Sequence, residues 1–281
     1  MYLTSLQTYS KILGSIIFAY FCTIGAKLYT NDGSSVSDCS ALLTLSHPSD
    51  MALSSPLKTA IVLGGSGTVG SGIVKALANC PLYEKVTLLG RSRIELPETE
   101  NYAKFTQTTM DFENISSQGA LFAGFSTAFY AIGVSQNKVD EETYRKIELT
   151  NALAIATLMK EASIPDIHWV TGGGSSKNSL FLFGRVKAEV EETIGKMGFR
   201  RVIIYRPGGI LADKSSSMGP KTTTVLRAVD PFHLMSVEAE LLGEVMVGNS
   251  IKEMEGEGNE MKILENCAIN KIGKDLKRPE N

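Results

Sequence analysis

A short apolar run that leads directly into three evenly spaced glycines constrains the fold of this chain more than any other feature. Residues 60–63 are apolar, and Gly64, Gly67 and Gly70 follow them. Apolar residues at helical spacing come next, so the stretch predicts a strand, a tight turn and a helix. The first glycine permits the turn, the second lets backbone approach a pyrophosphate, and the third lets the helix pack on its strand. The helix N-terminus would face the phosphates, which predicts a nucleotide site.

The composition suits one globular domain over residues 57–281, because 43% of the 281 residues are apolar and only 21% are charged. The formal net charge of -2 argues against general nucleic-acid binding, which requires a basic surface. The four cysteines and three histidines are dispersed without a CxxC pair. We therefore expect neither a disulfide framework nor a structural metal.

Residues 1–56 have a different character and predict an apolar targeting segment followed by a linker. Residues 12–26 are almost free of polar groups and lie between Lys11 and Lys27. This segment is shorter than the roughly 20 residues of a spanning helix. Three interpretations compete: a short anchor on an intracellular membrane, a cleaved signal peptide, and a segment absent from a working protein that begins at Met51. A signal peptide would send the chain to a compartment poor in dinucleotide, which argues against that interpretation. We therefore expect a cytoplasmic protein, anchored or targeted by this segment.

A basic turn after the second predicted strand, residues 85–89, indicates which dinucleotide would bind. Arg91 and Arg93 occupy the place where an NAD-binding unit carries a carboxylate for the ribose 2′-hydroxyl. A carboxylate would repel a 2′-phosphate, whereas a guanidinium binds it with charge-assisted hydrogen bonds worth roughly 1.5–3 kcal/mol each. The turn therefore predicts NADP(H) in preference to NAD(H). An ordinary exposed basic turn is the alternative.

Strands and helices are expected to alternate along the rest of the chain. The predicted strands are residues 105–110, 128–133, 167–171 and 202–205, and the predicted helices are residues 141–162, a run containing Lys187, and residues 237–246. This alternation implies a parallel sheet covered on both faces, an α/β fold of the Rossmann-type, doubly wound class. Ligands of such sheets bind outside the carboxyl ends of the strands, where Asp111 would face the adenine.

Six segments carry a resemblance to known proteins. They are residues 61–70, 86–91, 111–112, 186–190, 206–208 and 263–269. They resemble the extended, atypical short-chain dehydrogenase/reductase superfamily and, within it, the oxidoreductase-like family named for a human protein that interacts with HIV Tat. The glycine turn is shared by the whole superfamily, whereas the C-terminal Leu-Glu-Asn-x-Ala-Ile segment points to the narrower family. The likeness covers about residues 58–274 and implies NADP(H) at the glycine turn.

The resemblance also implies a catalytic pattern from which this chain departs. Members of the superfamily use a Tyr-x-x-x-Lys pair and an upstream Ser. The Tyr donates a proton as hydride arrives, the Lys holds the nicotinamide ribose, and the Ser orients the substrate oxygen. Lys187 is present, but Phe183 stands where Tyr is expected, and the family's Ser-Ser falls at Thr171-Gly172. A phenyl ring has no proton to give, and positioned acid–base catalysis is typically worth about 10²–10⁴ in rate.

Thr171 and Lys187 are the catalytic candidates that this pattern leaves, and Lys187 has ribose binding as its other role. Ser175, Ser176, Ser179, Tyr130 and Tyr144 are further hydroxyls for the missing acid, with loop polarity or core packing as the alternative for each. The predicted cofactor-binding residues are Gly64, Ser66, Gly67, Thr68, Val69, Gly70, Arg91, Arg93, Asp111, Ile132, Gly133, Lys187, Pro207 and Gly208.

Two functions remain open from the sequence. One is an NADPH-dependent oxidoreductase with a substituted proton donor. The other is a non-catalytic NADP(H)-binding protein whose cofactor state regulates a protein partner, as the resembled family's regulatory associations imply. Phe183 and Gly172 favour the second function, and the other site residues suit both. Residues 209–236, the natural substrate cover in extended members, form a short predicted loop that indicates no substrate.

Overall fold

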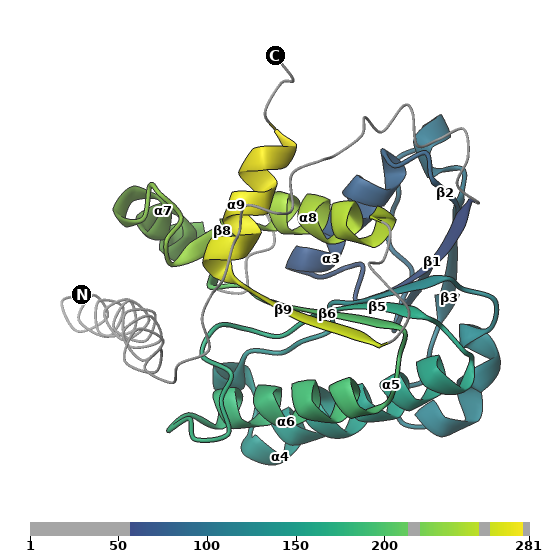
Figure 1. The fold of residues 1–281 in the computed structure, drawn as a ribbon, viewed down its shortest axis with the longest axis horizontal. Helices are drawn as coiled ribbons and strands as arrows, with labels where there is room; N and C mark the ends of the chain where they lie inside the picture. The colour runs from purple at the N-terminus through teal and green to yellow at the C-terminus, as the bar shows by residue number, and fades with distance from the viewer. Residues whose placement is uncertain (1–56, 213–219, 253–258, 278–281) are drawn as a thin grey trace, which may run out of the picture. The chain divides into compact units, whose positions relative to one another are not determined.

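A seven-stranded parallel sheet with helices on both faces organises the part of the chain that the structure describes (Figure 1). The computed structural model describes residues 57–212, 220–252 and 259–277. The predicted N-terminal segment and linker, residues 1–56, lie outside the described residues. The strand order is β3-β2-β1-β4-β5-β6-β9, and all neighbouring strands are parallel. This is the doubly wound order with one strand added at an edge, so the predicted fold class is confirmed.

The strands of this sheet agree closely with the predicted ones, with two exceptions. They are β1 (Lys58–Leu63), β2 (Tyr83–Gly90), β3 (Phe105–Thr109), β4 (Thr127–Tyr130), β5 (Asp166–Val170), β6 (Arg201–Arg206) and β9 (Glu260–Glu265). β4 ends three residues earlier than predicted, because the Ala131 N–H makes a last bond to the Leu63 carbonyl and the chain then leaves the sheet. β9 is not predicted as a strand, since apolar and polar residues show no simple alternation along it, and most of its side chains are exposed at the sheet edge.

The helices form one layer on each face of the sheet (Figure 1). On one face lie α3 (Thr68–Ala78), α8 (Ala239–Ile251) and α9 (Asn266–Leu276), and on the other lie α4 (Glu141–Arg145), α5 (Ala152–Glu161) and α6 (Leu182–Lys196). Short 3-10 helices span Glu100–Tyr102, Ile115–Phe122 and Gln136–Lys138. No helix within the described ranges is long and apolar enough to cross a bilayer.

Two predicted helices and one predicted loop need correction. The predicted helix over residues 141–162 is interrupted by a π-helical turn, Lys146–Asn151, that joins α4 to α5. The helix predicted from residue 237 begins at Ala239, because Ser236–Glu238 forms β8 and pairs with β7 (Gly209–Leu211). The short loop predicted over residues 209–236 instead contains this two-stranded sheet and helix α7 (Pro220–Val229).

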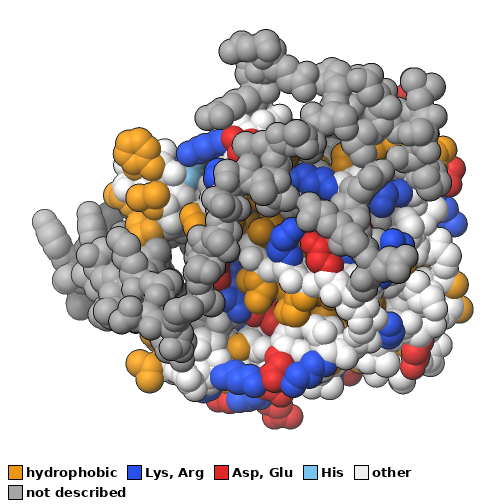
Figure 2. Space-filling view, viewed as in Figure 1, with side chains coloured by type: hydrophobic (Ala, Val, Ile, Leu, Met, Phe, Trp, Pro, Cys, Tyr) orange, Lys and Arg blue, Asp and Glu red, His pale blue; other side chains and the backbone are white. Residues whose placement is uncertain are grey.

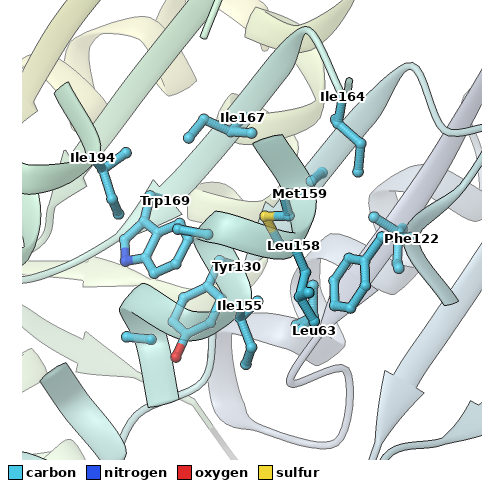
Figure 3. Close-up of a cluster of buried hydrophobic side chains, with 14 of the residues drawn as sticks. Leu63, Phe122, Tyr130, Ile155, Leu158, Met159, Ile164, Ile167, Trp169 and Ile194 are labelled. Atoms are coloured by element: carbon cyan, nitrogen blue, oxygen red, sulfur yellow. The ribbon is translucent and has the colours of Figure 1, made fainter. Parts of the chain in front are cut away.

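The core between the sheet and helices α5 and α6 fixes the ends of two central strands (Figure 3). Tyr130 at the end of β4 stacks on Trp169 of β5, with ring centroids 3.6 Å apart and planes inclined by 8°. Ile155 from α5 and Leu63 from β1 belong to the same buried cluster. Burial of side chains of this size contributes about 1.5–3 kcal/mol each, so the positions where β4 and β5 end are rigidly set.

Two glycines let α3 and α8 touch backbone to backbone on the opposite face. A Cβ added at Gly72 would lie 2.3 Å from the Ala239 carbonyl oxygen, and one added at Gly243 would lie 2.2 Å from the Gly72 carbonyl carbon. Contacts this close exclude any side chain at either position. The N-terminus of α3 is therefore held by a neighbouring helix as well as by the sheet.

A buried ion pair ties together the amino ends of β5 and β6, at the other end of the strands from the glycine turn. Arg201 donates to both carboxylate oxygens of Asp166, and its guanidinium also bonds the Ser250 carbonyl of α8. Burial alone would raise the pKa of the Asp166 carboxyl, but attraction to His168 and the hydrogen bonds from Arg201 lower it to about 2. This ion pair therefore stabilises the fold, and it lies at the opposite end of the sheet from the candidate site.

The surface agrees with the small net charge. Both basic and acidic side chains are scattered over the described part of the face in Figure 2. The described residues also contain no group of three His, Cys, Asp or Glu side chains arranged for a metal ion.

Candidate functional site

The glycine turn after β1 leaves no room for a side chain at two of its positions. Gly64 has φ +86°, and a Cβ there would lie 2.7 Å from the carbonyl oxygen of Ala131, the residue that follows the neighbouring strand β4. A Cβ at Gly70 would lie 1.9 Å from the Gly64 carbonyl oxygen. The Gly67 N–H donates to that same oxygen at 2.9 Å, which closes the turn. Positive φ and close backbone approach both require glycine here, as the sequence predicts.

The turn delivers the N-terminus of α3 to the carboxyl end of the sheet. α3 begins at Thr68 with Gly67 as its N-cap, and glycine has no side chain to cap the first turn. Ser66 is exposed beside this end, whereas Val69 is buried against the sheet. A helix N-terminus carries partial positive charge and unpaired N–H groups. The arrangement is suited to an anionic group such as a pyrophosphate.

The basic turn after β2 is clamped by a residue that sequence reasoning missed. Arg91 and Arg93 are both exposed. Directly after them, the Ile94 N–H donates to Oε1 of Gln107 at 2.8 Å, and Nε2 of Gln107 donates to the Ile94 carbonyl at 2.9 Å. Gln107 lies on β3. The sequence shows it only as a polar residue within a predicted strand and gives no indication that it bonds Ile94. The clamp fixes the backbone that follows the two exposed arginines.

Asp111 follows β3 as predicted, but its carboxylate bonds its own turn. Oδ1 accepts the Glu113 N–H at 2.9 Å and Oδ2 accepts Nδ2 of Asn114 at 2.6 Å. The hydrogen bonds from Asn114 and Glu113 hold the pKa of this exposed carboxyl below its usual range. The described contacts of Asp111 therefore shape the loop after β3, and its predicted contact with adenine stays a prediction.

The predicted Lys187 lies in a buried ion pair with Glu148, a residue that the sequence analysis did not select. Nζ of Lys187 lies 2.6 Å from Oε2 of Glu148, and the two side chains are 9% and 3% exposed. Oε1 of Glu148 accepts the Val134 N–H at 2.6 Å. The predicted Ile132 and Gly133 are the two residues before Val134, so this carboxylate joins the loop after β4 to helix α6.

The Phe183 ring fills the space beside Gly172. A Cβ added at Gly172 would lie 2.9 Å from both Cε2 and Cζ of Phe183. A serine at position 172 would therefore collide with this ring, and the ring could not lie where it does. Gly172 and Phe183, the two departures from the superfamily pattern, therefore form one structural feature. The ring can lie where it does only because residue 172 has no side chain, and neither residue carries a hydroxyl. The Phe183 N–H donates to Oε1 of Gln136 at 3.2 Å, which anchors the start of α6.

The Thr171 hydroxyl is bound within the protein. It donates to Oε1 of Glu191 at 2.6 Å, and both side chains are buried. Glu191 in turn accepts from the Arg206 guanidinium, which also bonds Glu265 at 2.8 Å. This network links the ends of β5, β6 and β9 with α6. In the described contacts the Thr171 hydroxyl therefore bonds a buried carboxylate, and its predicted catalytic role stays a prediction.

The turn after β6 is held by α9. The Pro207 carbonyl accepts the Gly173 N–H at 2.8 Å, and the Gly208 N–H donates to Oδ1 of Asn266 at 2.9 Å. Nδ2 of Asn266 bonds the carbonyls of residues 233, 234 and 236, which lie beside Gly208. A Cβ at Gly208 would lie 2.2 Å from the Met235 carbonyl oxygen. The Glu-Asn pair of the C-terminal family segment, Glu265 and Asn266, therefore builds this side of the site.

The two tyrosines considered as substitute acids are core residues. Tyr130 stacks on Trp169, and Tyr144 packs with Leu182 and Val186. Burial and, after it, the negative charge of Glu148 raise the pKa of both phenols. Both side chains are almost completely inaccessible to solvent. The core-packing alternative is the one their environment supports.

The serines after β5 bond to backbone groups of their own loop. Oγ of Ser175 donates to the Gly172 carbonyl at 2.7 Å. Oγ of Ser176 accepts the Asn178 N–H at 3.3 Å, and Oγ of Ser179 accepts the Phe181 N–H at 3.2 Å. These contacts fit the loop-polarity alternative.

Comparison with curated proteins supports the resemblance read from the motifs. No protein-family model matches the chain. Protein HTATIP2 of Rattus norvegicus is 29% identical over 227 residues, which cover 79% of this chain and 92% of that protein. The mitochondrial protein FMP52 of Saccharomyces cerevisiae is 25% identical over 164 residues, covering 56% of this chain and 68% of that protein. The predicted resemblance to the Tat-interacting-protein family is confirmed.

Solved structures share the fold. A short-chain dehydrogenase family protein of Francisella tularensis superposes with a TM-score of 0.55 at 11% identity, over 75% of this chain and 98% of that one. MoeE5 in complex with UDP-glucuronic acid and NAD superposes with a TM-score of 0.57 at 13% identity, over 74% and 76%. At this identity the likeness establishes the fold alone, a Rossmann-type fold.

Proposed function

We propose that this protein binds NADP(H) at the glycine turn and keeps it as a regulatory ligand, with little or no hydride transfer to a substrate. The observation that carries the second half of this proposal is the contact between Phe183 and Gly172, in which a packed phenyl ring stands where the superfamily pattern has the Tyr and one of its two serines. In this proposal a protein partner distinguishes the form of this protein that has bound NADP(H) from the form without it.

The residues present fit a dinucleotide. The glycines at 64 and 70 let the backbone of the turn pack closely against itself and the loop after β4, and α3 begins directly after this turn. The pyrophosphate would lie against that N-terminus, beside Ile132 and Gly133, and Lys187 would bond the nicotinamide ribose. MoeE5, which has the same fold, was solved with NAD.

The preference for NADP(H) rests on Arg91 and Arg93. Both guanidinium groups are exposed, and the backbone that carries them is fixed by Gln107. A charge-assisted hydrogen bond to a 2′-phosphate is worth roughly 1.5–3 kcal/mol, and a difference of about 1.4 kcal/mol corresponds to a tenfold difference in affinity. Two such bonds would therefore favour NADP(H) by more than tenfold.

The proposal of a non-catalytic site follows from where the polar groups point. When bound, NADPH supplies a hydride, and reduction of a carbonyl then needs a proton at the oxygen. In the described residues the Thr171 hydroxyl donates to Glu191, and the tyrosines nearby are buried with raised pKa values. Without a positioned acid, the rate would be lower by about 10²–10⁴.

Quenching of the single tryptophan, Trp169, tests the binding half of the proposal. Titration of the full chain should show NADPH binding at least about tenfold tighter than NADH binding. The Arg91→Ala/Arg93→Ala variant should lose this difference. Arg145→Ala removes another exposed arginine, one paired with Glu141 on α4, and should keep the difference. Absence of NADPH binding, or equal binding of NADH, would contradict the proposal.

An NADPH-dependent oxidoreductase is the second candidate, and the buried, well-held Lys187 favours it. Consumption of NADPH with simple aldehydes and quinones separates the two functions. We expect background rates for the wild type and a measurable rise for Phe183→Tyr, which returns a phenol to position 183. Brisk turnover by the wild type would establish the oxidoreductase instead.

The N-terminal segment is proposed to hold the protein at an intracellular membrane. Its apolar residues 12–26 and flanking lysines support this, as does the mitochondrial name of the Saccharomyces cerevisiae relative. Carbonate extraction of membranes should retain the full chain and release a chain that begins at Met51. Equal release of both would contradict an anchor.

A further inference from the structure

We infer that Glu148 is the positioning residue for the nicotinamide half of the cofactor site. The inference rests on the proposed binding of NADP(H). Glu148 would hold Lys187 and the loop after β4 with the two oxygens of one carboxylate, so that the two walls of the site keep a fixed separation.

Each oxygen of this carboxylate has a different partner at short distance. Oε2 lies 2.6 Å from Nζ of Lys187 on α6, and Oε1 accepts the Val134 N–H at 2.6 Å. Lys187 and Val134 are 53 residues apart along the chain (187 − 134) and belong to different elements. Contact with the same carboxylate therefore fixes their relative position more directly than the backbone between them could.

The partners of Glu148 lie where a dinucleotide would pass. Val134 closes the loop that leaves β4 at the point where the strand order reverses, between β1 and β4. Such a reversal is where ligands of this fold bind. A Cβ added at Gly133 would lie 3.2 Å from Oε1 of Glu148, so the loop backbone runs closely past the carboxylate.

Burial makes the pair interdependent. Both side chains are almost fully removed from water, so removal of one charge would leave the other without compensation. Glu148 also influences the two neighbouring phenols, because its charge adds to burial in raising the pKa values of Tyr130 and Tyr144. The carboxylate thus sets the electrostatics of the site beyond its two direct contacts.

The backbone around Glu148 is itself irregular. The residue lies in the π-helical turn Lys146–Asn151 between two regular helices. Single π-turns inside α-helices are rare and frequently occur at functional sites, because the extra residue redirects the side chains of that turn. Here the redirected side chain is a buried carboxylate bonded to a lysine.

Two ligands of different length distinguish positioning from general damage. NADPH would reach from the arginine turn to Lys187, whereas adenosine 2′,5′-bisphosphate carries the 2′-phosphate and would reach only the Arg91 end. Glu148→Gln keeps the shape of the side chain and an acceptor for the Val134 N–H but removes the charge opposite Lys187. We expect NADPH affinity to fall at least about tenfold, the loss of one charge-assisted contact, while the affinity for the bisphosphate stays within about twofold.

A matched control is available on the same π-turn. Lys146 pairs with Glu113 at the same 2.6 Å distance, but both side chains are exposed, at 49% and 71%. Glu113→Gln should leave the affinity for both ligands unchanged. A double-mutant cycle with Lys187→Met adds a further readout, because Glu148→Gln should cost little additional NADPH affinity once Lys187 is absent.

Two results would overturn the inference: an equal loss of affinity for both ligands, or unchanged NADPH affinity in a folded Glu148→Gln variant. If Glu148→Gln does not fold, Glu148→Asp decides instead. This variant keeps the charge one methylene shorter and should weaken NADPH selectively. Failure of the wild type to bind either ligand would contradict the proposed function itself. A Glu148→Gln variant that binds both ligands as the wild type does would contradict only the role of Glu148.

Discussion

Substitution of Gly172 by alanine tests whether the Phe183 ring occupies the space that the superfamily gives to a serine. The added Cβ would lie 2.9 Å from two ring carbons, whereas carbon atoms pack best at about 3.5–4.0 Å. The ring must therefore move by roughly 0.6–1 Å. It packs against the buried cluster of Tyr144, Leu182 and Val186, so the movement disturbs other side chains.

The expected loss of stability follows from two opposing effects. Overpacking of this kind costs about 1–3 kcal/mol, while replacing glycine by alanine recovers about 0.4–1 kcal/mol from the unfolded chain. We expect Gly172→Ala to lower the free energy of unfolding by about 0.5–2 kcal/mol and Tm by about 2–6 °C. Urea denaturation and calorimetry would measure the two quantities.

The neighbouring glycine provides the control. A Cβ at Gly173 would lie 3.4 Å from the Pro207 carbonyl oxygen, an ordinary contact, and neither glycine has a positive φ. Gly173→Ala should therefore leave stability unchanged or slightly raised. The smaller side chain of Phe183→Leu should make Gly172→Ala less costly. Additive effects of Gly172→Ala and Phe183→Leu, or equal effects at the two glycines, would refute the contact on which the non-catalytic proposal rests.

Three further predictions concern the scaffold. Gly243→Ala should cost about 3 kcal/mol in denaturant unfolding, because the added Cβ would lie 2.2 Å from backbone of α3; a loss below 1 kcal/mol would argue against the close helix contact. Asn266→Ala should cost about 2–3 kcal/mol by the same measurement, since it removes the acceptor of the Gly208 N–H and the donor to three carbonyls; a neutral result would be inconsistent with that role. Acid should weaken the fold through Asp166, whose pKa of about 2 lies below the ordinary 3.8. As the pH falls, this carboxyl is protonated in the unfolded chain before it is protonated in the folded protein. The pair therefore contributes about 2 kcal/mol to the free energy of unfolding above pH 3.8, and this contribution is lost as the pH falls through 2. Asp166→Asn should lack this part of the acid transition, and identical acid profiles would contradict the assignment.

The sequence predicted those parts of the protein that depend on neighbours along the chain. The glycine spacing, the helical period after Gly70 and the apolar runs are local features, and backbone sterics and side-chain periodicity translate them directly into a strand, a turn and a helix. The order of these elements then determined the fold class, because alternating strands and helices have few ways to bury their apolar faces. The arrangement of Arg91 and Arg93 after β2 is local in the same sense.

The elements that the sequence did not predict depend on partners distant in the chain. The side chains of β9 are mostly exposed, and its strand conformation depends on pairing with β6 at the edge of the sheet. The Gln107 clamp on the arginine turn and the Asn266 contact with Gly208 join residues whose separation gives no periodic signal. The π-turn that breaks the long predicted helix places Glu148 beside Lys187, 39 residues away.

The sequence by itself therefore determined the fold class and a turn with the features of a dinucleotide cradle, while the chemistry around that cradle depended on tertiary structure. A serine-to-glycine and a tyrosine-to-phenylalanine departure look like separate losses in the sequence, but in three dimensions Gly172 and Phe183 occupy one volume. Thr171 and Lys187 look available in the sequence, yet each is bonded to a buried carboxylate from elsewhere in the fold. The physical reason is that hydrogen bonding and burial decide what a polar group can do, and both are properties of the packed structure.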